Sequence, residues 1–279
     1  RFSIALDIAR RGLPTGIAMI VDAHVHIGRS FAPWRTDDAD ADLVTTAREA
    51  GIDRMLVSSL GDTGYIAYPT PDEMRAANDH VLEAMDRFPG FVFGLCYVTP
   101  EHADAALDEI RRCVEDGPMV GIKLWIARKA SDPSVDPILD AAERLGVPVL
   151  QHAFYKTPGN LPDESDAADV ARLAARHPGA IIQMAHLYGV GERGVQDIAP
   201  YPNVLLDTSG SDPESGLLDY AVDCLGAERI LFGSDAPGRD FAIQLAKVAG
   251  ADLTDAQRGL ILGGNAARML GWEAEGGDA

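Results

Sequence analysis

An apolar run near the start of the chain ends in a cluster of ionisable residues. Residues 19–21 lead into Asp22, His24 and His26, in the pattern D-x-H-x-H. Alternate residues of a strand point to the same side, so the two histidines can reach one metal ion together. Imidazole and carboxylate groups suit Zn²⁺, Mn²⁺ or Fe²⁺. The pattern alone is a weak signal, because a polar strand end with only a packing role has the same composition.

Residues of the same kinds end apolar runs far downstream. His152, His186 and Asp235 each end such a run, Lys123 lies near the end of another, and Asp207 is placed similarly. Four of the seven histidines thus fall at the ends of predicted strands. A chance arrangement would have to supply all of these positions at once. We therefore interpret the set as a catalytic metal site with an open coordination position.

The elements that position these residues are eight continuous apolar runs, which is typical of strands buried on both faces. The predicted strands are 19–26, 54–60, 91–98, 119–125, 147–153, 180–186, 203–209 and 229–235. Helical patterns separate them, and the one at 192–200 is the least clear. Eight strand–helix units close a (β/α)₈ TIM barrel of the α/β class. The rival is a doubly wound open sheet, but no G-x-G-x-x-G loop follows the first strand.

Catalytic groups of a parallel barrel gather at the C-terminal ends of its strands. Four histidines, a lysine and an aspartate would then meet at one mouth. An ion held there lowers the pKa of its bound water from about 16 to about 7. Asp235 would serve as both ligand and proton acceptor, and His186 would orient the water or polarise the substrate.

These motifs resemble the amidohydrolase superfamily, and within it the amidohydrolase-2, or aminocarboxymuconate-semialdehyde-decarboxylase-like, branch. The resemblance covers Met19 to Leu270. It rests on DAHVHIG, GIKLW, LQHA, MAHL and FGSDAP at five strand ends, and on the closing GGNAARMLG.

The resemblance implies a role for each candidate residue. The implied metal ligands are His24, His26, His152 and Asp235. His186 would be the catalytic histidine beside the metal. We expect Asp22 either to support the strand or to orient a ligand histidine from behind.

Lys123 leaves the number of metal ions open. In binuclear members of the superfamily a lysine at this strand end is carboxylated and bridges two metals, with His186 on the second ion. In the decarboxylase-like branch one metal is usual, and Lys123 would then bind substrate or support the structure. We favour one divalent ion, with zinc ahead of manganese and iron.

Three functions fit the site. The first is hydrolysis of an amide, ester or lactone of a small, carboxylated molecule by metal-activated water. The alternative is non-oxidative decarboxylation of an unsaturated or aromatic carboxylic acid with the same metal and histidine. The third, a barrel that has lost activity and only binds a ligand, is disfavoured by the intact ligand set.

Composition limits the partners. The net charge of −19 disfavours nucleic acid and anionic membranes, and no apolar run is long enough to span a bilayer. Three cysteines without C-x-x-C spacing fit a reducing cytoplasm. We expect a small-molecule substrate, and a homodimer would be in keeping with the group.

One domain is expected over residues 19–272, with an extension at 1–18 and a tail at 273–279. Loop residues offer further contacts with substrate. Trp34 and Trp125 could line the pocket or cover the barrel top. One of four loop arginines could clamp a substrate carboxylate, and these are Arg29, Arg35, Arg128 and Arg239.

Overall fold

The computed structural model describes residues 17–28, 38–61, 64–211 and 213–272. Eight parallel strands form one sheet in chain order, so each strand pairs with the next along the sequence. The strands are β1 (Val21–Ile27), β2 (Arg54–Ser59), β3 (Val92–Tyr97), β4 (Gly121–Leu124), β5 (Val149–Gln151), β6 (Ile182–Met184), β7 (Val204–Asp207) and β8 (Ile230–Leu231). The predicted TIM barrel is confirmed.

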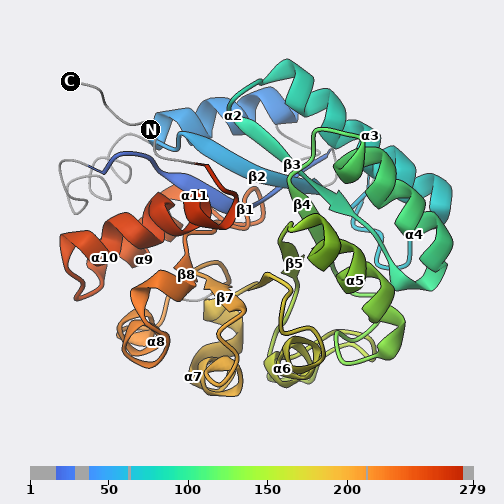
Figure 1. The fold of residues 1–279 in the computed structure, drawn as a ribbon. Helices are drawn as coiled ribbons and strands as arrows, with labels where there is room; N and C mark the ends of the chain where they lie inside the picture. Colours follow the sequence, from blue (N-terminus) through green and yellow to red (C-terminus); the bar gives the residue numbers. More distant parts are fainter. Residues whose placement is uncertain (1–16, 29–37, 62–63, 212, 273–279) are drawn as a thin grey trace.

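The last strand returns to the first and closes the barrel. The backbone amide of Asp235 donates to the carbonyl of His24 at 2.8 Å, and the amide of His26 donates to that of Ala236 at 2.7 Å. Figure 1 shows β8 beside β1, with the chain turning once around the ring of strands. Because of this closure, the two ends of the domain contribute to the same mouth.

Helices cover the outside of the barrel (Figure 1). They are α2 (Ala39–Glu49), α3 (Pro71–Arg87), α4 (Ala103–Ile110), α5 (Asp136–Leu145), α6 (Ala167–Arg176), α7 (Leu187–Ile198), α8 (Leu217–Leu225), α9 (Phe241–Gly250), α10 (Asp255–Gly259) and α11 (Asn265–Met269). In the described part of the chain, no helix is long and apolar enough to cross a bilayer.

Local sequence explains where the helices begin and end. Thr70 and Glu73 form a capping box at the start of α3, and Asp166 and Asp169 form another at the start of α6. Each pair satisfies backbone amides that have no partner within the helix. Gly146 ends α5 in the left-handed conformation, with φ of 68°.

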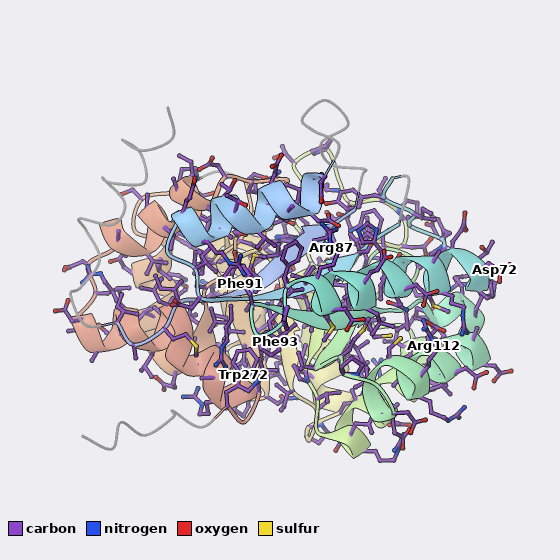
Figure 2. All side chains as sticks on the ribbon, turned by 90° about the horizontal axis from the view of Figure 1, so that it is seen from above. Asp72, Arg87, Phe91, Phe93, Arg112 and Trp272 are labelled. Atoms are coloured by element: carbon purple, nitrogen blue, oxygen red, sulfur yellow. The ribbon has the colours of Figure 1, made fainter. Side chains whose placement is uncertain are left out.

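The opposite end of the barrel from the candidate site is closed by aromatic packing. Phe93 of β3 lies 4.5 Å from Trp272, between ring centroids, and the guanidinium of Arg54 lies 4.6 Å from the Trp272 ring. Figure 2 shows Phe93 and Trp272 together on the strand ends near the C-terminal helices. This contact ties the end of the described chain to the barrel.

The predicted boundaries need two corrections. Every strand ends earlier than predicted except β1, so His152, His186 and Asp235 lie just beyond β5, β6 and β8. The uncertain segment at 192–200 belongs to α7, which begins at Leu187 and is kinked at Tyr188 and Gly191. Most of the predicted extension at 1–18, the tail at 273–279, and Arg29, Trp34 and Arg35 lie outside the described residues.

Candidate metal centre

Three side chains at the barrel mouth bring donor atoms to one point. Nε2 of His24 lies 3.2 Å from Nε2 of His26, and Oδ1 of Asp235 lies 3.8 Å and 3.4 Å from these nitrogens. Ligands about 2.1 Å from one ion stand about 3.0 Å apart at a right angle and about 3.4 Å apart at the tetrahedral angle. The spacing of the three atoms therefore fits a common divalent ion.

Neighbouring groups fix which nitrogen of each histidine can bind an ion. Nδ1 of His24 lies 2.9 Å from Oδ2 of Asp207. A carboxylate only accepts, so Nδ1 carries the hydrogen and Nε2 keeps a lone pair. Oγ of Ser58 lies 2.9 Å from Nδ1 of His26 and can accept in the same way. Two lone pairs and a carboxylate oxygen then face one another, which is an arrangement that a cation relieves.

The protonation states of the cluster suit metal binding. Burial lowers the pKa of His26 to about 4, so this imidazole is neutral at pH 7. Burial acts to raise the pKa of Asp235, but the adjacent histidines, His26 first among them, hold it well below its usual range. A neutral imidazole and an ionised carboxylate are the forms that bind metals.

His152 and His186 form a second pair beside this cluster. Nδ1 of His152 lies 3.1 Å from Nε2 of His186, and the centroid of the His186 ring lies 5.1 Å from that of His24. Nε2 of His152 lies 2.9 Å from Oε1 of Glu164. The structure thus brings His24, His26 and Asp235 together as one potential metal-binding group, while His152 lies outside that group and contacts His186.

Lys123 approaches the cluster from β4. Its Nζ lies 3.4 Å from Nε2 of His24, and the side chain is buried. Burial lowers the pKa of Lys123 to about 8, although the carboxylates of Asp235 and Asp207 partly oppose this shift. The amine is therefore buried directly beside the cluster.

Two aspartates, Asp22 and Asp207, support His24 through different contacts. Asp22 accepts hydrogen bonds from the backbone amides of His24 and Ser234 through Oδ1, so it joins β1 to the β8 end. Burial raises its pKa to about 7. Asp207 contacts the His24 ring itself. Asp22 thus supports the strand, and the carboxylate that orients the histidine is Asp207.

The backbone turns sharply at two of the site residues. His186 and Asp235 have φ values of 74° and 59°, in the left-handed region. Such a conformation is uncommon for residues other than glycine, although aspartate and histidine adopt it more often than most. Each turn follows the end of a strand, β6 or β8, and places the side chain in or beside the cluster.

Aromatic rings border the mouth. The centroid of Tyr65 lies 6.0 Å from that of His26 and 5.0 Å from that of Trp125. Phe154 lies 6.2 Å from His152 in a stacked arrangement. We call Tyr65, Trp125 and Phe154 the aromatic rim. The rim offers flat apolar surface directly beside the polar cluster.

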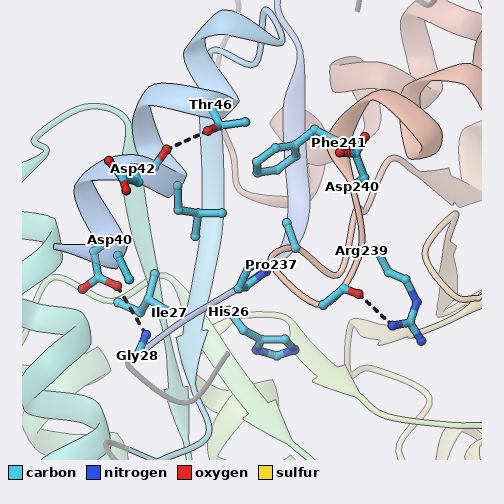
Figure 3. Close-up of a pocket in the computed structure, with 14 residues that line it drawn as sticks. His26, Ile27, Gly28, Asp40, Asp42, Thr46, Pro237, Arg239, Asp240 and Phe241 are labelled. Carbon is cyan, nitrogen blue, oxygen red and sulfur yellow. Dashed lines mark hydrogen bonds between the residues drawn. The ribbon is translucent and has the colours of Figure 1, made fainter. Parts of the chain in front are cut away.

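A cavity of about 330 Å³ opens next to His26, between α2 and the loop from β8 to α9. Figure 3 shows His26 and Arg239 at one side of this cavity and Phe241 at another. The Nε atom of Arg239 has no hydrogen-bond partner among the described residues. Arg128 is instead paired with Glu101 at 2.5 Å. Nη1 and Nη2 of Arg239 donate to the carbonyl of Gly238 and the hydroxyl of Ser211, and of the two arginines described Arg239 is the one that lines this cavity.

Sequence reasoning assigned no role to three residues that hold the histidines. Asp207 was visible as a polar strand end, but nothing in the sequence connects it with His24. Glu164 lies in a predicted helix start, where an acidic residue usually serves the helix. Ser58 lies one residue before the end of β2 and carries no signal, because serine is common near strand ends.

Comparison with known proteins gives matches across nearly the whole domain. The family model described as Amidohydrolase matches residues 21–272. A 96-residue segment is 28% identical to 2-amino-3-carboxymuconate-6-semialdehyde decarboxylase of Dictyostelium discoideum. That segment is 33% of this chain and only 27% of the relative.

Solved structures with the same fold include two decarboxylases. The 2,6-dihydroxybenzoate decarboxylase from Rhizobium superposes with a TM-score of 0.71 at 20% identity, over 91% of this chain and 98% of that one. A dihydroxybenzoic acid decarboxylase from Polaromonas sp. JS666, with manganese and 2-nitroresorcinol bound, gives 0.72 at 18% identity, over 91% and 97%. At these identities the likeness establishes the fold.

Proposed function

The chain belongs to the Amidohydrolase family, and from this premise we propose that it is a metal-dependent, non-oxidative decarboxylase of an unsaturated or aromatic carboxylic acid. The curated relative and both solved relatives described above carry that activity in their names. They favour decarboxylation over the hydrolysis of an amide, ester or lactone, which the sequence alone placed first.

The observation that carries the proposal is the position of the aromatic rim around the cluster. Tyr65, Trp125 and Phe154 lie within 5.4–6.5 Å of the site histidines, between ring centroids. Flat rings stack on planar conjugated molecules, and offset or edge-on contacts add to their burial. A planar acid would rest on the rim with its carboxylate toward Lys123 and the three donor atoms.

The residues fit a single divalent ion. His24, His26 and Asp235 would hold it, with His152 as the fourth ligand that the family resemblance implies. Manganese becomes as strong a candidate as zinc, because the Polaromonas relative binds manganese. When bound, the ion supplies a Lewis acid that orients the substrate carboxylate and stabilises negative charge.

The remaining chemistry falls to side chains of the site. Decarboxylation replaces a carboxylate by hydrogen, so one C–C bond breaks, CO₂ leaves and a proton reaches the same carbon. Lys123, with its pKa near 8, is protonated at pH 7 and can pair with the carboxylate or deliver this proton. His186 is neutral, because burial keeps its pKa well below its usual value, so it can accept a proton from a substrate hydroxyl.

A product assay tests the proposal. The protein, loaded with Mn²⁺ or Zn²⁺, is offered unsaturated and aromatic carboxylic acids together with lactones and amides. We expect CO₂ from at least one acid and, in D₂O, one deuterium on the carbon that lost the carboxylate. Asp235→Asn should release none. Acid release from a lactone or amide, with no CO₂ from any acid, would restore the hydrolase reading.

A further inference from the structure

Glu164 is a fully buried carboxylate in the loop between β5 and α6. It lies outside the three-donor cluster, and its carboxylate contacts His152, Lys156 and the backbone of Leu161. Burial acts to raise its pKa, but the hydrogen bonds from His152, Lys156 and Leu161 outweigh this effect and hold the pKa at about 2. An ammonium and a backbone amide are donors only, so this position suits a carboxylate that accepts from all its partners.

The two oxygens of Glu164 share one partner and differ in another. Nζ of Lys156 lies 2.7 Å from each oxygen, whereas Oε1 alone lies 2.9 Å from Nε2 of His152 and Oε2 alone accepts from the amide of Leu161 at 3.0 Å. An ionised carboxylate has no hydrogen to give, so His152 must donate through Nε2. A neutral imidazole carries one hydrogen, and this contact places it on Nε2. Its Nδ1 is thus left with a lone pair.

The partners of His186 also determine which of its ring nitrogens carries the hydrogen. The single hydroxyl hydrogen of Ser209 faces Oδ1 of Asp207 at 2.5 Å. Ser209 Oγ then accepts from Nδ1 of His186, which lies 2.8 Å away. Nε2 of His186 also keeps a lone pair, and it faces Nδ1 of His152 at 3.1 Å. Two more acceptors are thereby aimed at one another beside the cluster.

The loop holds Glu164 firmly in place. Nδ2 of Asn160 donates to the carbonyls of Phe154 and Ser165 at 2.6 Å and 3.2 Å, which closes the loop on itself. Oγ of Ser165 accepts from the amide of Ala130, in the neighbouring loop after β4. The carboxylate therefore has a fixed position relative to the end of β5.

From these contacts we infer that Glu164 is a positioning residue of the metal centre: it fixes the Nε2–H tautomer and the ring plane of His152, so that the lone pair of Nδ1 points into the site. The importance of that lone pair as a ligand rests on the proposed metal-dependent function. The tautomer itself follows from Glu164, whatever the reaction.

Glu164→Gln gives a directional test. The Leu161 amide donates to Oε2 only, so the amide oxygen of the glutamine should keep that place and the new NH₂ group would face His152. It would donate to Nε2 and force the hydrogen onto Nδ1. Long-range ¹H–¹⁵N spectra of full-length, metal-free protein should show His152 as Nε2–H in the wild type and as Nδ1–H in the variant. The His152 signals are assigned as those missing from His152→Gln.

Metal affinity gives a second readout that does not depend on turnover. Loss of such a supporting partner typically weakens metal binding about 10- to 100-fold. We expect a weakening of this size for Zn²⁺ and Mn²⁺ in Glu164→Gln, measured by competition with a chelating dye. Glu164→Asp keeps the charge and should restore the Nε2–H tautomer and part of the affinity.

Asp163→Asn is the matched control. Asp163 precedes Glu164, and its Oδ2 accepts from the hydroxyl of Tyr68 at 2.8 Å at the rim of the mouth. The variant removes the same charge one residue away and should leave tautomer and metal affinity unchanged. An Nδ1–H signal for His152 in the wild type would overturn the inference, even if Glu164→Gln failed to fold. Unchanged tautomer and affinity in a folded Glu164→Gln would do the same.

The test of Glu164 and the test of the proposed function can fail independently of each other. Neither the spectra nor the metal titrations involve a substrate. Absence of CO₂ from every acid would refute the decarboxylase and leave the tautomer result standing. Decarboxylation by a protein with the Nδ1–H tautomer would refute only the role of Glu164.

Discussion

At the scale of single residues, each histidine of the cluster depends on a partner that accepts the hydrogen of its Nδ1, so that its Nε2 keeps a lone pair. Asp207 serves His24 and Ser58 serves His26, at 2.9 Å each. Such partners set both the tautomer and the direction of the ring, and they commonly matter almost as much as the ligands. The chemistry of the site is thus shared between groups that would touch a metal and groups that never would.

Removal of a donor should abolish stoichiometric metal binding. His26→Ala removes one of the four proposed ligands, and Asp235→Asn replaces the only carboxylate among them by a neutral amide, so both variants should bind the ion much more weakly. Elemental analysis after dialysis should find about one ion per chain in the wild type and close to none in the variants. His102→Ala, an exposed histidine away from the cluster, should keep the wild-type content. Full occupancy in both cluster variants would exclude this site.

Asp22 should make stability depend on pH. Its pKa is about 7 in the folded protein and about 3.8 when exposed, so between these values only the folded state holds the proton. Stability from this group is therefore present below about pH 4 and lost as the pH rises to 7, by at most about 1.4 kcal/mol per pH unit. Urea unfolding of metal-free Asp22→Asn should lack this component.

The measurement compares the unfolding free energies of the wild type and Asp22→Asn at each pH. The unfolding free energy of the wild type, minus that of Asp22→Asn, should fall between pH 4.5 and 7.5. Curves that stay parallel across this range would show that Asp22 is ionised in the folded state.

The sequence pointed to the candidate metal ligands, but not to the residues that orient them. Histidine and aspartate at the ends of apolar runs are unusual, so His24, His26 and Asp235 stood out. Asp207 and Glu164 did not, because acidic residues after strands and before helices have ordinary structural uses. Their role depends on distances across 183 and 12 residues of chain, which spacing alone does not give.

At the scale of elements, three strands end shortly before residues of the candidate site. β5, β6 and β8 stop before His152, His186 and Asp235, and the left-handed turns at the latter two residues direct them inward. Apolar composition predicted all eight strands, because buried parallel strands are continuously apolar. It extended them too far, because a site residue following a strand has no feature that marks the end of the hydrogen-bonded ladder.

Gly233, just after β8, should be needed for the site's geometry. A Cβ at this position would lie 3.0 Å from Cβ of His24 and 3.1 Å from Cβ of Asp207. Gly233→Ala should therefore push this pair aside, destabilise the fold by about 1–3 kcal/mol and weaken metal binding. Thermal melting and a chelator competition measure the two effects.

Gly250→Ala is the matched control for this change. Gly250 ends α9, and a Cβ there meets no atom within 4 Å. It should melt at or slightly above the wild-type temperature, because alanine favours the helix. If Gly233→Ala behaved like Gly250→Ala in both measurements, close packing at Gly233 would be unimportant for the site.

At the scale of the whole molecule, a strongly acidic protein surrounds a mouth built to receive an anion. The net charge is −19, whereas Lys123 and Arg239 are the cations closest to the cluster and its adjoining cavity among the described residues. The long-range field should repel a carboxylate that the local groups attract. Association with substrate then depends on how far the outer charges are screened.

Salt should therefore raise the rate of capture of an anionic substrate. The Debye length falls to about 10 Å at 0.1 M salt, which screens distant surface carboxylates more than groups within the mouth. We expect kcat/KM for the acid found in the product assay to increase from 0.01 M to about 0.1 M NaCl. A steady decrease over this range would mean that the local cations dominate the field.

Closure of the barrel by β8 on β1 also sets an order of events during biosynthesis. His24 and His26 leave the ribosome more than two hundred residues before Asp235, and the amide of Asp235 bonds to the carbonyl of His24 only when the ring of strands is complete. A nascent chain thus carries a two-histidine fragment for most of its synthesis. Selection of the metal is consequently a property of the closed barrel, made against whichever ions are present when the end of β8 bonds to β1.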